Sequence, residues 1–332
     1  DLLEQVRELA EDGKFDYLVI ESTGISEPMP VAETFTFKDP KGQALSDVAR
    51  LDTLVTVVDA GSFSDNLNSV ATLKEEGMEV GPEDSRGLVD LLIQQVEFAN
   101  VIIVNKVDTV DAATVTRVKA TLARLNTKAE ILTATRSAVP LTSILNTKRF
   151  SMAEAESAPG WLVELRGEHI PESEEYGISS FVYRRRRPFH PQRLADALAD
   201  GSVLKRVVRS KGFLWLATRQ STGGVWEHAG RVHRVVPGGP WYAAVHYAMW
   251  PPSWRSMRHE WLPEPVGDRH TELVIIGMSH DQASITAALD AACLTDEEFD
   301  EGPAKWAEYP DPFTAWPAFT GPAPQGKLPD SI

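Results

Sequence analysis

The residues Asn105, Lys106, Val107 and Asp108 form a motif whose residue types and spacing fit one chemistry, the recognition of guanine. Guanine presents an N1–H and an exocyclic amine side by side, and one fixed carboxylate such as Asp108 accepts both hydrogen bonds. Adenine has no such pair of donors, so the aspartate would select guanine. Asn105 would tie neighbouring loops, and the aliphatic stem of Lys106 would cover the base. The alternative is a plain strand-to-helix turn in which Asp108 caps the helix.

A second polar cluster, "ESTG", follows the apolar run Tyr17 to Ile20. We expect this run to be a buried parallel strand that ends at a polar site. Beside the guanine motif, Glu21 is predicted to hold Mg²⁺ through water, and Gly24 lets the backbone approach a γ-phosphate. Alternatively, Ser22 or Thr23 caps a helix that starts at Ser26.

Asp59 ends a third apolar run, Leu54 to Val58, and points to the same edge of the expected sheet. Its carboxylate could support Mg²⁺ through water, as the other acids at strand ends would. It could equally cap the helix that follows. The two interpretations stay open at this level.

The elements that position these motifs alternate between helix and strand over the first 150 residues. We expect helices at 2–11, 87–99 and 112–126, and strands at 17–20, 54–58, 101–104 and 130–135. Ligands gather at the carboxyl ends of the strands in such a parallel sheet. The fold class is therefore α/β, in the form of a nucleotide-binding domain. The string G-x-x-x-x-G-K-[ST], which binds phosphates, does not occur in the 332 residues and is expected upstream of Asp1.

The chain divides into further parts by composition. We predict a nucleotide-binding domain at 1–150, a linker rich in acids, Pro and Gly at 151–176, a smaller α+β domain at 177–300, and an irregular tail at 301–332. In the α+β domain, strands are expected at 178–189, 213–219, 223–230, 231–238 and 271–278. Helices are expected at 190–201 and 281–294.

The composition fits a cytoplasmic protein. Apolar residues make up 42% of the chain, and no run of about 18 apolar residues is present, so no contact with a membrane is expected. The helical start has no signal-peptide pattern, and a single cysteine, Cys293, fits a reducing compartment. The net charge of −15 argues against a protein that coats nucleic acid.

Arg184 to Arg187 begin a basic segment inside this acidic chain. Three interpretations are open: a charged edge strand that resists aggregation, a docking patch for an acidic client, or a contact with RNA, for example on a ribosome.

His228 and His233 lie in adjoining strands that a hairpin could bring together for a metal, but we expect them to be core or surface residues.

The strings "ESTGISEP", "LVTVVDA", "LLIQQVEFANVIIVNKVD" and "ISSFVYRRRRPFHPQRL" together resemble the CobW-like family of GTP-binding metal chaperones. The resemblance covers the chain to about residue 300. It implies a P-loop G domain, whose N-terminal part is missing here, followed by an α+β C-terminal domain. It also implies that Glu21 and Gly24 are the switch motif and that Asn105, Lys106 and Asp108 bind the guanine. Ala134 and Thr135 would lie near the base.

The resemblance implies a GTP hydrolase that delivers zinc, or sometimes cobalt, to a client metalloprotein through its C-terminal domain. The family's P-loop and its Cys-x-Cys-Cys metal motif precede the first helix and are not in this sequence, so the chain alone is expected to be inactive and the main Zn²⁺ site is expected upstream. The alternative is an adaptor whose GTPase times its contact with a client or ribosome. A structural protein with an inactive nucleotide fold is a third option.

Overall fold

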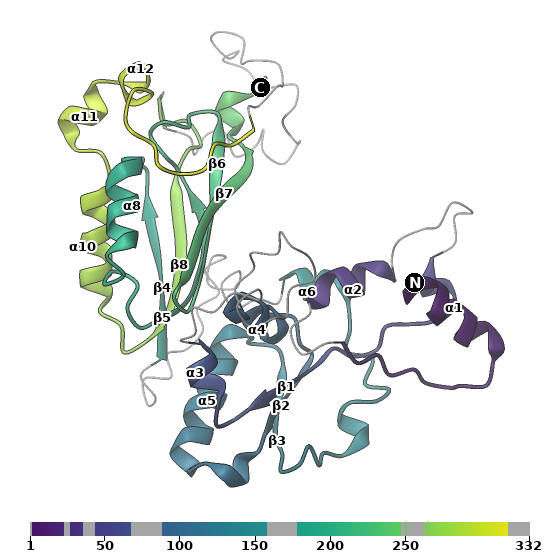
Figure 1. Cartoon of the computed structure of the whole chain (residues 1–332). Helices are drawn as coiled ribbons and strands as arrows, with labels where there is room; N and C mark the ends of the chain where they lie inside the picture. Colours follow the sequence, from purple (N-terminus) through teal and green to yellow (C-terminus); the bar gives the residue numbers. More distant parts are fainter. Residues whose placement is uncertain are drawn as a thin grey trace. The chain divides into compact units, whose positions relative to one another are not determined.

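A computed structural model describes residues 2–22, 27–35, 44–67, 88–157, 178–246, 250, 262–263 and 265–317. The chain forms two compact units, unit 1 (Asp1–Ile178) and unit 2 (Ser179–Ile332), which are described separately below. Each unit is built on its own sheet (Figure 1). No helix in these described ranges is both long and apolar enough to cross a bilayer.

Unit 1 contains a parallel sheet of three strands in the order β1-β2-β3. The strands are β1 (Val55–Asp59), β2 (Val101–Asn105) and β3 (Glu130–Thr133). The register pairs Val55 with Val101 and Asp59 with Asn105, and β3 continues it on the other side of β2. The central strand is an unbroken run of buried β-branched residues, as a strand covered on both faces requires. The sequence therefore predicted β1, β2 and β3 to within one or two residues.

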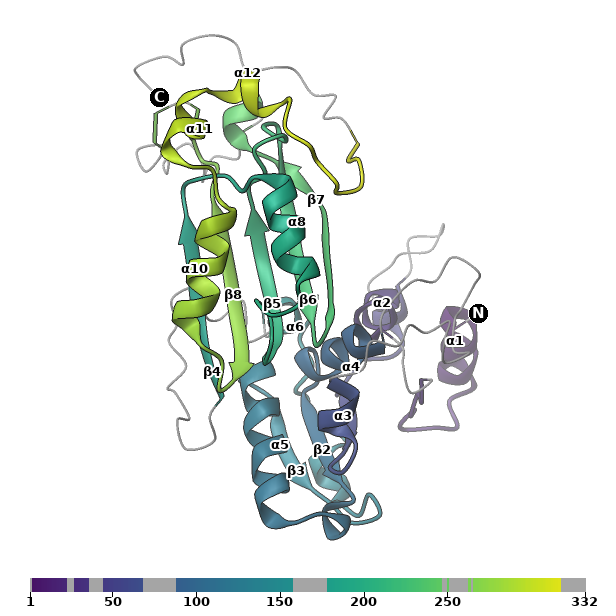
Figure 2. The ribbon, with the colours of Figure 1, turned by 60° about the vertical axis from the view of Figure 1, so that its left-hand side comes forward.

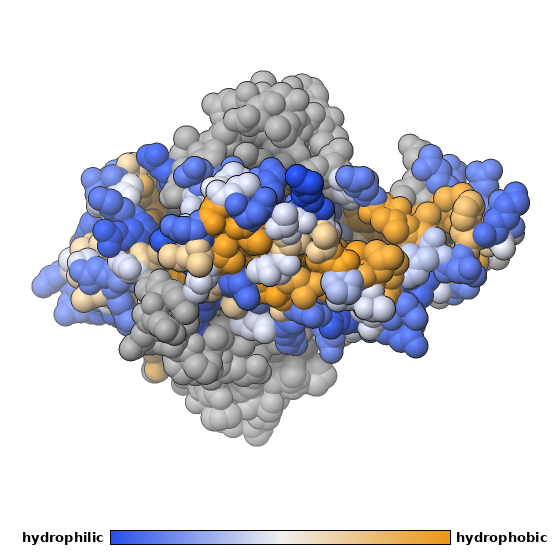
Figure 3. Space-filling model, turned by 90° about the horizontal axis from the view of Figure 1, so that it is seen from below, coloured by the Kyte–Doolittle hydropathy of each residue, from blue (hydrophilic) through white to orange (hydrophobic). Residues whose placement is uncertain are grey.

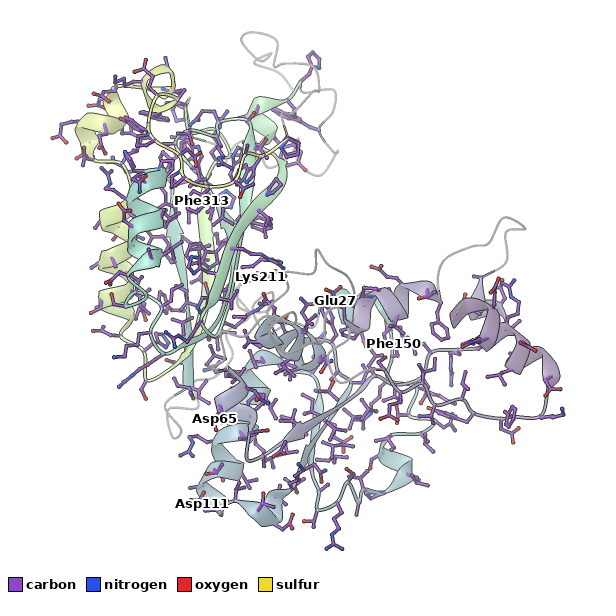
Figure 4. The ribbon with its side chains drawn as sticks, viewed as in Figure 1. Glu27, Asp65, Asp111, Phe150, Lys211 and Phe313 are labelled. Atoms are coloured by element: carbon purple, nitrogen blue, oxygen red, sulfur yellow. The ribbon has the colours of Figure 1, made fainter. Side chains whose placement is uncertain are left out.

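Helices α4 (Leu88–Glu97) and α5 (Ala112–Leu125) lie in the connections between these strands, where α5 packs against β2 and β3 and α4 packs against α5 (Figure 2). Asp111 begins α5 by accepting a hydrogen bond from the Thr114 N–H at 2.7 Å, and its place at the start of the helix is labelled in Figure 4. The amide of Asn126 ends the helix by donating to the carbonyls of Val96 and Ala99, each at 2.8 Å. These contacts fix the loops at which both helices end.

The remaining elements of unit 1 are short or lie at its N-terminal side. They are α1 (Leu2–Asp12), α2 (Pro28–Thr34), η1 (Leu45–Asp47), α3 (Phe63–Leu67), η2 (Val107–Thr109), η3 (Leu141–Ser143) and α6 (Met152–Ser157). Helix α1 buries Val6 in a small cluster with Phe35 and Leu45. Its bounds agree with the prediction.

The predicted buried strand at Tyr17 to Ile20 is wrong for this structure. These residues form extended chain outside any sheet, and their four side chains are exposed. The apolar run has the composition of a strand, but it does not pair with β1, the strand at the edge of the described sheet. Val55 and Val57 of β1 are exposed as well, and Figure 3 shows apolar side chains, in orange, on the surface of this unit.

Asp52 anchors the chain at the start of β1. Its buried carboxylate accepts hydrogen bonds from the Tyr17 hydroxyl at 2.8 Å, the Thr53 hydroxyl at 2.7 Å, and the Thr147 and Lys148 N–H groups at 3.0 and 2.8 Å. Burial alone would raise the pKa of Asp52, but these hydrogen bonds outweigh it and hold the pKa at about 2. Asp52 therefore joins three segments that are far apart in the sequence.

Unit 2 is built on a sheet of five strands in the order β4-β8-β5-β6-β7. The strands are β4 (Ile178–Arg185), β5 (Val207–Leu214), β6 (Thr222–Ala229), β7 (Val232–Pro240) and β8 (Thr271–Met278). The pairs β5–β6, β5–β8 and β6–β7 are antiparallel. At Gly212 an added Cβ would lie 2.0 Å from the Glu272 carbonyl oxygen, so β5 and β8 approach closely only because this residue is glycine.

Helices α8 (Pro191–Ala199) and α10 (Gln282–Ala292) lie side by side over one face of this sheet (Figures 1 and 2). Pro191 occupies the first turn of α8, and Asp281 caps α10 through the Ala283 and Ser284 N–H groups. The core between helices and sheet includes Tyr183, Phe189, Leu194, Leu198, Leu214, Trp226, Leu273, Ile275, Ile285 and Leu289.

The strand expected at 213–219 begins earlier, at Val207, and ends at Leu214. The chain leaves the sheet there because Trp215 enters a second core cluster with Trp241 and Trp306, and Phe189 bonds to the backbone of Trp215 and Ala217. The other strands of unit 2 lie where the sequence predicts strands, although β4 ends at Arg185.

Residues beyond 300, expected to be irregular, contain a short helix in the described part. Helix α11 (Asp296–Asp300) is followed by α12 (Pro303–Trp306), and η5 (Tyr242–Ala244) lies near the end of β7. Arg219 holds the chain after α12 by a bidentate ion pair with Asp311, by stacking on Trp316, and by a hydrogen bond to the carbonyl of Phe313, which is labelled in Figure 4. The domain boundaries themselves stay predictions.

Candidate functional site

The predicted guanine-binding residues lie where the carboxyl ends of β1, β2 and β3 meet. Asp59 ends β1, Asn105 ends β2, and Ala134 follows β3 directly. Asp59 and Asn105 are register partners, and the Ala134 N–H donates to the Val104 carbonyl at 2.8 Å. The sheet thus brings three separate segments of the sequence to one edge, which is the edge that binds ligands in parallel sheets.

Asn105 ties the loop after β2 to the loop after β3. The side-chain Nδ2 of Asn105 donates to Ser137 Oγ at 2.9 Å, and the side-chain Oδ1 accepts from the Ser137 N–H at 2.8 Å. The Val107 N–H also donates to the Ala134 carbonyl at 3.3 Å. The predicted linking role of Asn105 thus has a defined partner. Sequence reasoning missed Ser137, although a small hydroxyl residue in the loop after the next strand was the available signal.

Lys106 extends its ammonium group to Asp59, at 2.6 Å between Nζ and Oδ2. The hydrogen bond from Lys106 is the main cause that lowers the pKa of Asp59, and the same bond raises the pKa of Lys106. Asp59 Oδ1 also accepts from the Gly61 N–H at 2.8 Å, in the turn before α3. Both carboxylate oxygens therefore have partners within the chain, and Asp59 stabilises the turn before α3.

Asp108 lies in η2 with an exposed side chain. Within the described ranges it forms no side-chain hydrogen bond or ion pair. The alternative interpretation, in which Asp108 caps the next helix, is wrong because Asp111 caps α5. The carboxylate of Asp108, three residues after Asn105 in the sequence, is therefore exposed to solvent.

Ala134 and Thr135 differ in exposure. Ala134 is buried with Val101 and Ile103, whereas Thr135 is exposed in the loop. The next two residues, Arg136 and Ser137, adopt left-handed backbone conformations with φ of 53° and 55°. Non-glycine residues rarely adopt this conformation. The loop after β3 therefore turns sharply, and its position at the sheet edge rests on Ala134 and on the clasp between Ser137 and Asn105.

The second predicted cluster is only partly described. Glu21 lies in exposed, extended chain and makes no side-chain bond to the described part of the protein, while Gly24 lies outside the described residues. Thr23 and the predicted helix start at Ser26 also lie outside the described residues, and the next described helix, α2, begins at Pro28. The roles of Glu21, Gly24 and Asp59 with Mg²⁺ stay predictions.

A cavity of about 520 Å³ lies at the other edge of the sheet, at the amino ends of β2 and β3. It is lined by Phe98, Ala99, Asn100, Lys128, Ala129, Glu130, Lys148, Arg149 and Glu154. Ligands of parallel α/β sheets bind at the carboxyl ends of the strands, so this cavity is at the wrong edge for the predicted nucleotide. Its size alone does not outweigh the chemistry of the polar edge.

The basic run of unit 2 is largely neutralised by acids of the same unit. Arg184 pairs with Glu272, Arg185 forms a bidentate pair with Asp290 at 2.7 Å, and Arg187 pairs with Asp296 at 2.6 Å. Arg186 is exposed. Arg184 and Arg185 lie in the edge strand β4, as the first interpretation requires, whereas Arg186 and Arg187 follow it.

His228 and His233 face each other across β6 and β7. His228 is 2% exposed, and no described residue bonds to its Nδ1 atom. Burial, with smaller effects of His233 and Arg209, lowers the pKa of His228 to about 3. The described residues contain no group of three or more His, Cys, Asp or Glu side chains arranged for a metal. These features agree with a core histidine.

Cys293 is also unsuited to bind zinc in this structure. Its side chain is buried beside the Tyr183 hydroxyl, 3.6 Å from its sulfur, and burial raises the pKa of the thiol to about 11. Zinc binds the thiolate, which this environment disfavours.

Comparisons with known proteins agree with both units. Residues 1–133 match the CobW/HypB/UreG nucleotide-binding domain, and residues 178–293 match the cobalamin synthesis protein cobW C-terminal domain. The chain is 44% identical over 317 residues to zinc-regulated GTPase metalloprotein activator 1 of Dictyostelium discoideum, a match that covers 94% of this chain and 66% of that protein. It is 29% identical over 332 residues to the zinc chaperone Rv0106 of Mycobacterium tuberculosis, covering 95% of this chain and 76% of that protein.

The crystal structure of the Zn(II)-bound YjiA GTPase from E. coli aligns with 88% of this chain and 76% of that chain. The sequence identity is 21% and the TM-score is 0.37. The chain spans 66% of the length of the Dictyostelium relative.

Proposed function

Because the chain belongs to the CobW family, we propose that the protein hydrolyses GTP and couples this reaction to delivery of zinc, or of cobalt, to a client metalloprotein. The observation that carries the proposal is the edge formed by β1, β2 and β3. Asn105 is clasped there by Ser137, Lys106 is paired with Asp59, and Asp108 presents an open carboxylate. The names of the Dictyostelium and M. tuberculosis relatives support the zinc-linked part.

Guanine recognition follows from the chemistry of Asp108. Its two carboxylate oxygens would accept the N1–H and the amine of the base, which adenine cannot offer. Lys106 would lay its methylene stem along the flat base while its ammonium group stays with Asp59. Thr135 and the buried Ala134 would border the base on the side of β3.

The phosphate side of the site depends on residues that stay predictions. Glu21 would hold Mg²⁺ through water, and Gly24 would let the backbone approach the γ-phosphate. When bound, Mg²⁺ neutralises charge that develops on the phosphates. A phosphate-binding loop and a thiolate zinc site remain part of the proposal because the family resemblance implies both.

The partner is proposed to be a client metalloprotein that contacts unit 2. The alternative, an adaptor that contacts a client or a ribosome through Arg184 to Arg187, loses support because three of the four arginines are already paired with acids. RNA binding depends on cationic side chains that neutralise backbone phosphates and thereby release the counterions condensed on the RNA. A cytoplasmic location also stays a prediction that rests on the single cysteine.

The test uses the protein encoded by the complete open reading frame. Calorimetry should show binding of GTP and GDP in preference to ATP, and phosphate release should respond to Zn²⁺. Asp108→Asn should weaken GDP binding by about 100-fold, because it removes the negative charge and replaces one of the two acceptor oxygens with an amide nitrogen, which donates and cannot accept from the base. Asp111→Asn is the matched control, since Asp111 caps α5 and faces no base.

Equal affinity for GTP and ATP in the unmodified protein would overturn the proposed nucleotide. Guanine selectivity without any response of hydrolysis to Zn²⁺ would leave the GTPase and remove the zinc coupling. Retained GDP affinity in Asp108→Asn would show that the base is read elsewhere.

A further inference from the structure

Asp59 and Lys106 join two strand ends that are adjacent in the sheet. Lys106 Nζ lies 2.6 Å from Asp59 Oδ2. Asn105, the residue before Lys106, is the register partner of Asp59 in the pairing of β1 with β2. The second carboxylate oxygen of Asp59 accepts the Gly61 N–H at 2.8 Å. The carboxylate is therefore held by its own turn while it holds the lysine.

Lys106 needs such a partner because of its backbone. Its φ of 57° is in the left-handed region, which costs free energy for a residue with a side chain. Asn105 on one side is fixed by Ser137, and the Thr109 N–H and hydroxyl both bond to the Lys106 carbonyl. Thus the backbone is clasped, and Asp59 fixes the far end of the long side chain.

This geometry competes with a metal role for Asp59. A carboxylate that supports Mg²⁺ through water must direct an oxygen at the hydrated ion. Here Oδ2 faces the Lys106 ammonium and Oδ1 faces the Gly61 N–H. An ammonium group 2.6 Å from the carboxylate also repels a divalent cation.

We propose that Asp59 is a positioning residue of the guanine site, which acts by holding the Lys106 side chain along the base. The inference rests on the proposed nucleotide. In this proposal, the end of β1 and the loop after it contribute to binding of the base rather than of the phosphates. It also makes base recognition a property of three strand ends: Asp59 on β1, Asn105 to Asp108 after β2, and Ser137 after β3.

The experiment measures GDP and ATP affinity for the complete protein, for Asp59→Ala, for Lys106→Met and for the double variant, each with Mg²⁺ and with a chelator. Asp59→Ala should weaken GDP binding about fivefold, equally in both conditions, and leave ATP binding unchanged. In the Lys106→Met background, the second substitution should add almost nothing. Asp59→Glu should restore part of the affinity, because it keeps the charge.

Asp65→Asn serves as the matched control, because Asp65 is an exposed carboxylate on α3 and its loss changes the net charge equally. Thermal unfolding checks that each variant folds. A GDP defect that occurs only with Mg²⁺ would make Asp59 a metal ligand and overturn the proposal. Additive losses in the double variant, or an unchanged Asp59→Ala, would overturn it as well. If the unmodified protein does not prefer GDP to ATP, the proposed nucleotide fails instead.

Discussion

The two sheets of this protein differ in how completely they are covered by their own residues. The five-stranded sheet of unit 2 packs one face against α8 and α10 and buries aromatic side chains in two clusters. The three-stranded sheet of unit 1 leaves Val55 and Val57 of β1 exposed, and Tyr17 to Ile20 lie in the open as well. Parallel sheets are normally covered on both faces. Unit 2 is thus the self-contained part, whereas unit 1 carries the polar edge.

Polar contacts join distant segments of the sequence in both units. In unit 2, ion pairs such as Arg185–Asp290, Arg193–Glu298 and Arg219–Asp311 join elements far apart in the sequence. In unit 1, the long-range links include the hydrogen bonds of Asp52 and Asn126, the clasp between Asn105 and Ser137, and the ion pair between Asp59 and Lys106. Of these links, the clasp of Asn105 and the ion pair of Asp59 lie at the candidate site, whereas Asp52 lies at the opposite end of β1.

The largest expected effect comes from the core of unit 2. Trp215 is fully buried and packs edge-on against Trp306 at 6.1 Å between ring centroids. Trp215→Ala should lower the free energy of unfolding of unit 2 by about 3–5 kcal/mol, because it leaves a cavity. Hydrogen exchange resolved by peptide measures each unit separately. If exchange in 88–157 rises as much as in unit 2, the two units do not unfold independently.

In unit 1, the strongest single contact is expected at Asp52. A pKa of about 2 against an ordinary 3.8 corresponds to about 2 kcal/mol at neutral pH. Because the folded pKa is lowered, this stability is present above about pH 4 and is lost as the pH falls through 2. Asp52→Asn should remove it at pH 7 and flatten the acid limb of the denaturation curve. An unchanged acid limb would show that other carboxylates control it.

The buried His228 gives unit 2 an acid sensitivity of its own. Its pKa is lowered from 6.5 to about 3, so the folded state keeps it neutral while the unfolded chain takes up a proton. Unit 2 should lose stability as the pH falls from about 6.5 toward 3, by up to about 1.4 kcal/mol per pH unit. His228→Gln should reduce this slope, and His233→Gln should do so less. Equal slopes in all three proteins would contradict the assignment.

The sequence predicted most elements because their local signals agreed with their tertiary surroundings. Strand β2 is a run of β-branched residues that the fold buries, and α5 begins at Ala112, the residue that the sequence predicts. Tyr17 to Ile20 have the same apolar signal as β2, but strand formation also needs a neighbour to pair with, which no local pattern encodes. Trp215 falls in the strand predicted at 213–219, but its packing partner Trp306 lies 91 positions later, which no local pattern reveals.

The candidate site shows the same limit. The motif Asn105 to Asp108 could be read directly, since its chemistry resides in adjacent residues. Ser137 and the ion pair of Asp59 with Lys106 depend on which strand ends lie together, and the sheet order supplies that information. Gly24 lies outside the described residues, so its role rests on the motif alone.

The smallest expected effect tests the open face of unit 1 directly. Val57 is 57% exposed, and the next residue, Val58, is 6% exposed because it points to the opposite face of β1. Threonine has the same shape as valine but adds a hydroxyl. Val58→Thr should therefore cost about 1–2 kcal/mol by burying that group, whereas Val57→Thr should change the free energy of unfolding by less than about 0.5 kcal/mol. Chemical denaturation of the two variants measures the difference. A similar loss in both would mean that Val57 is covered in solution, and the contrast between the two sheets would then disappear.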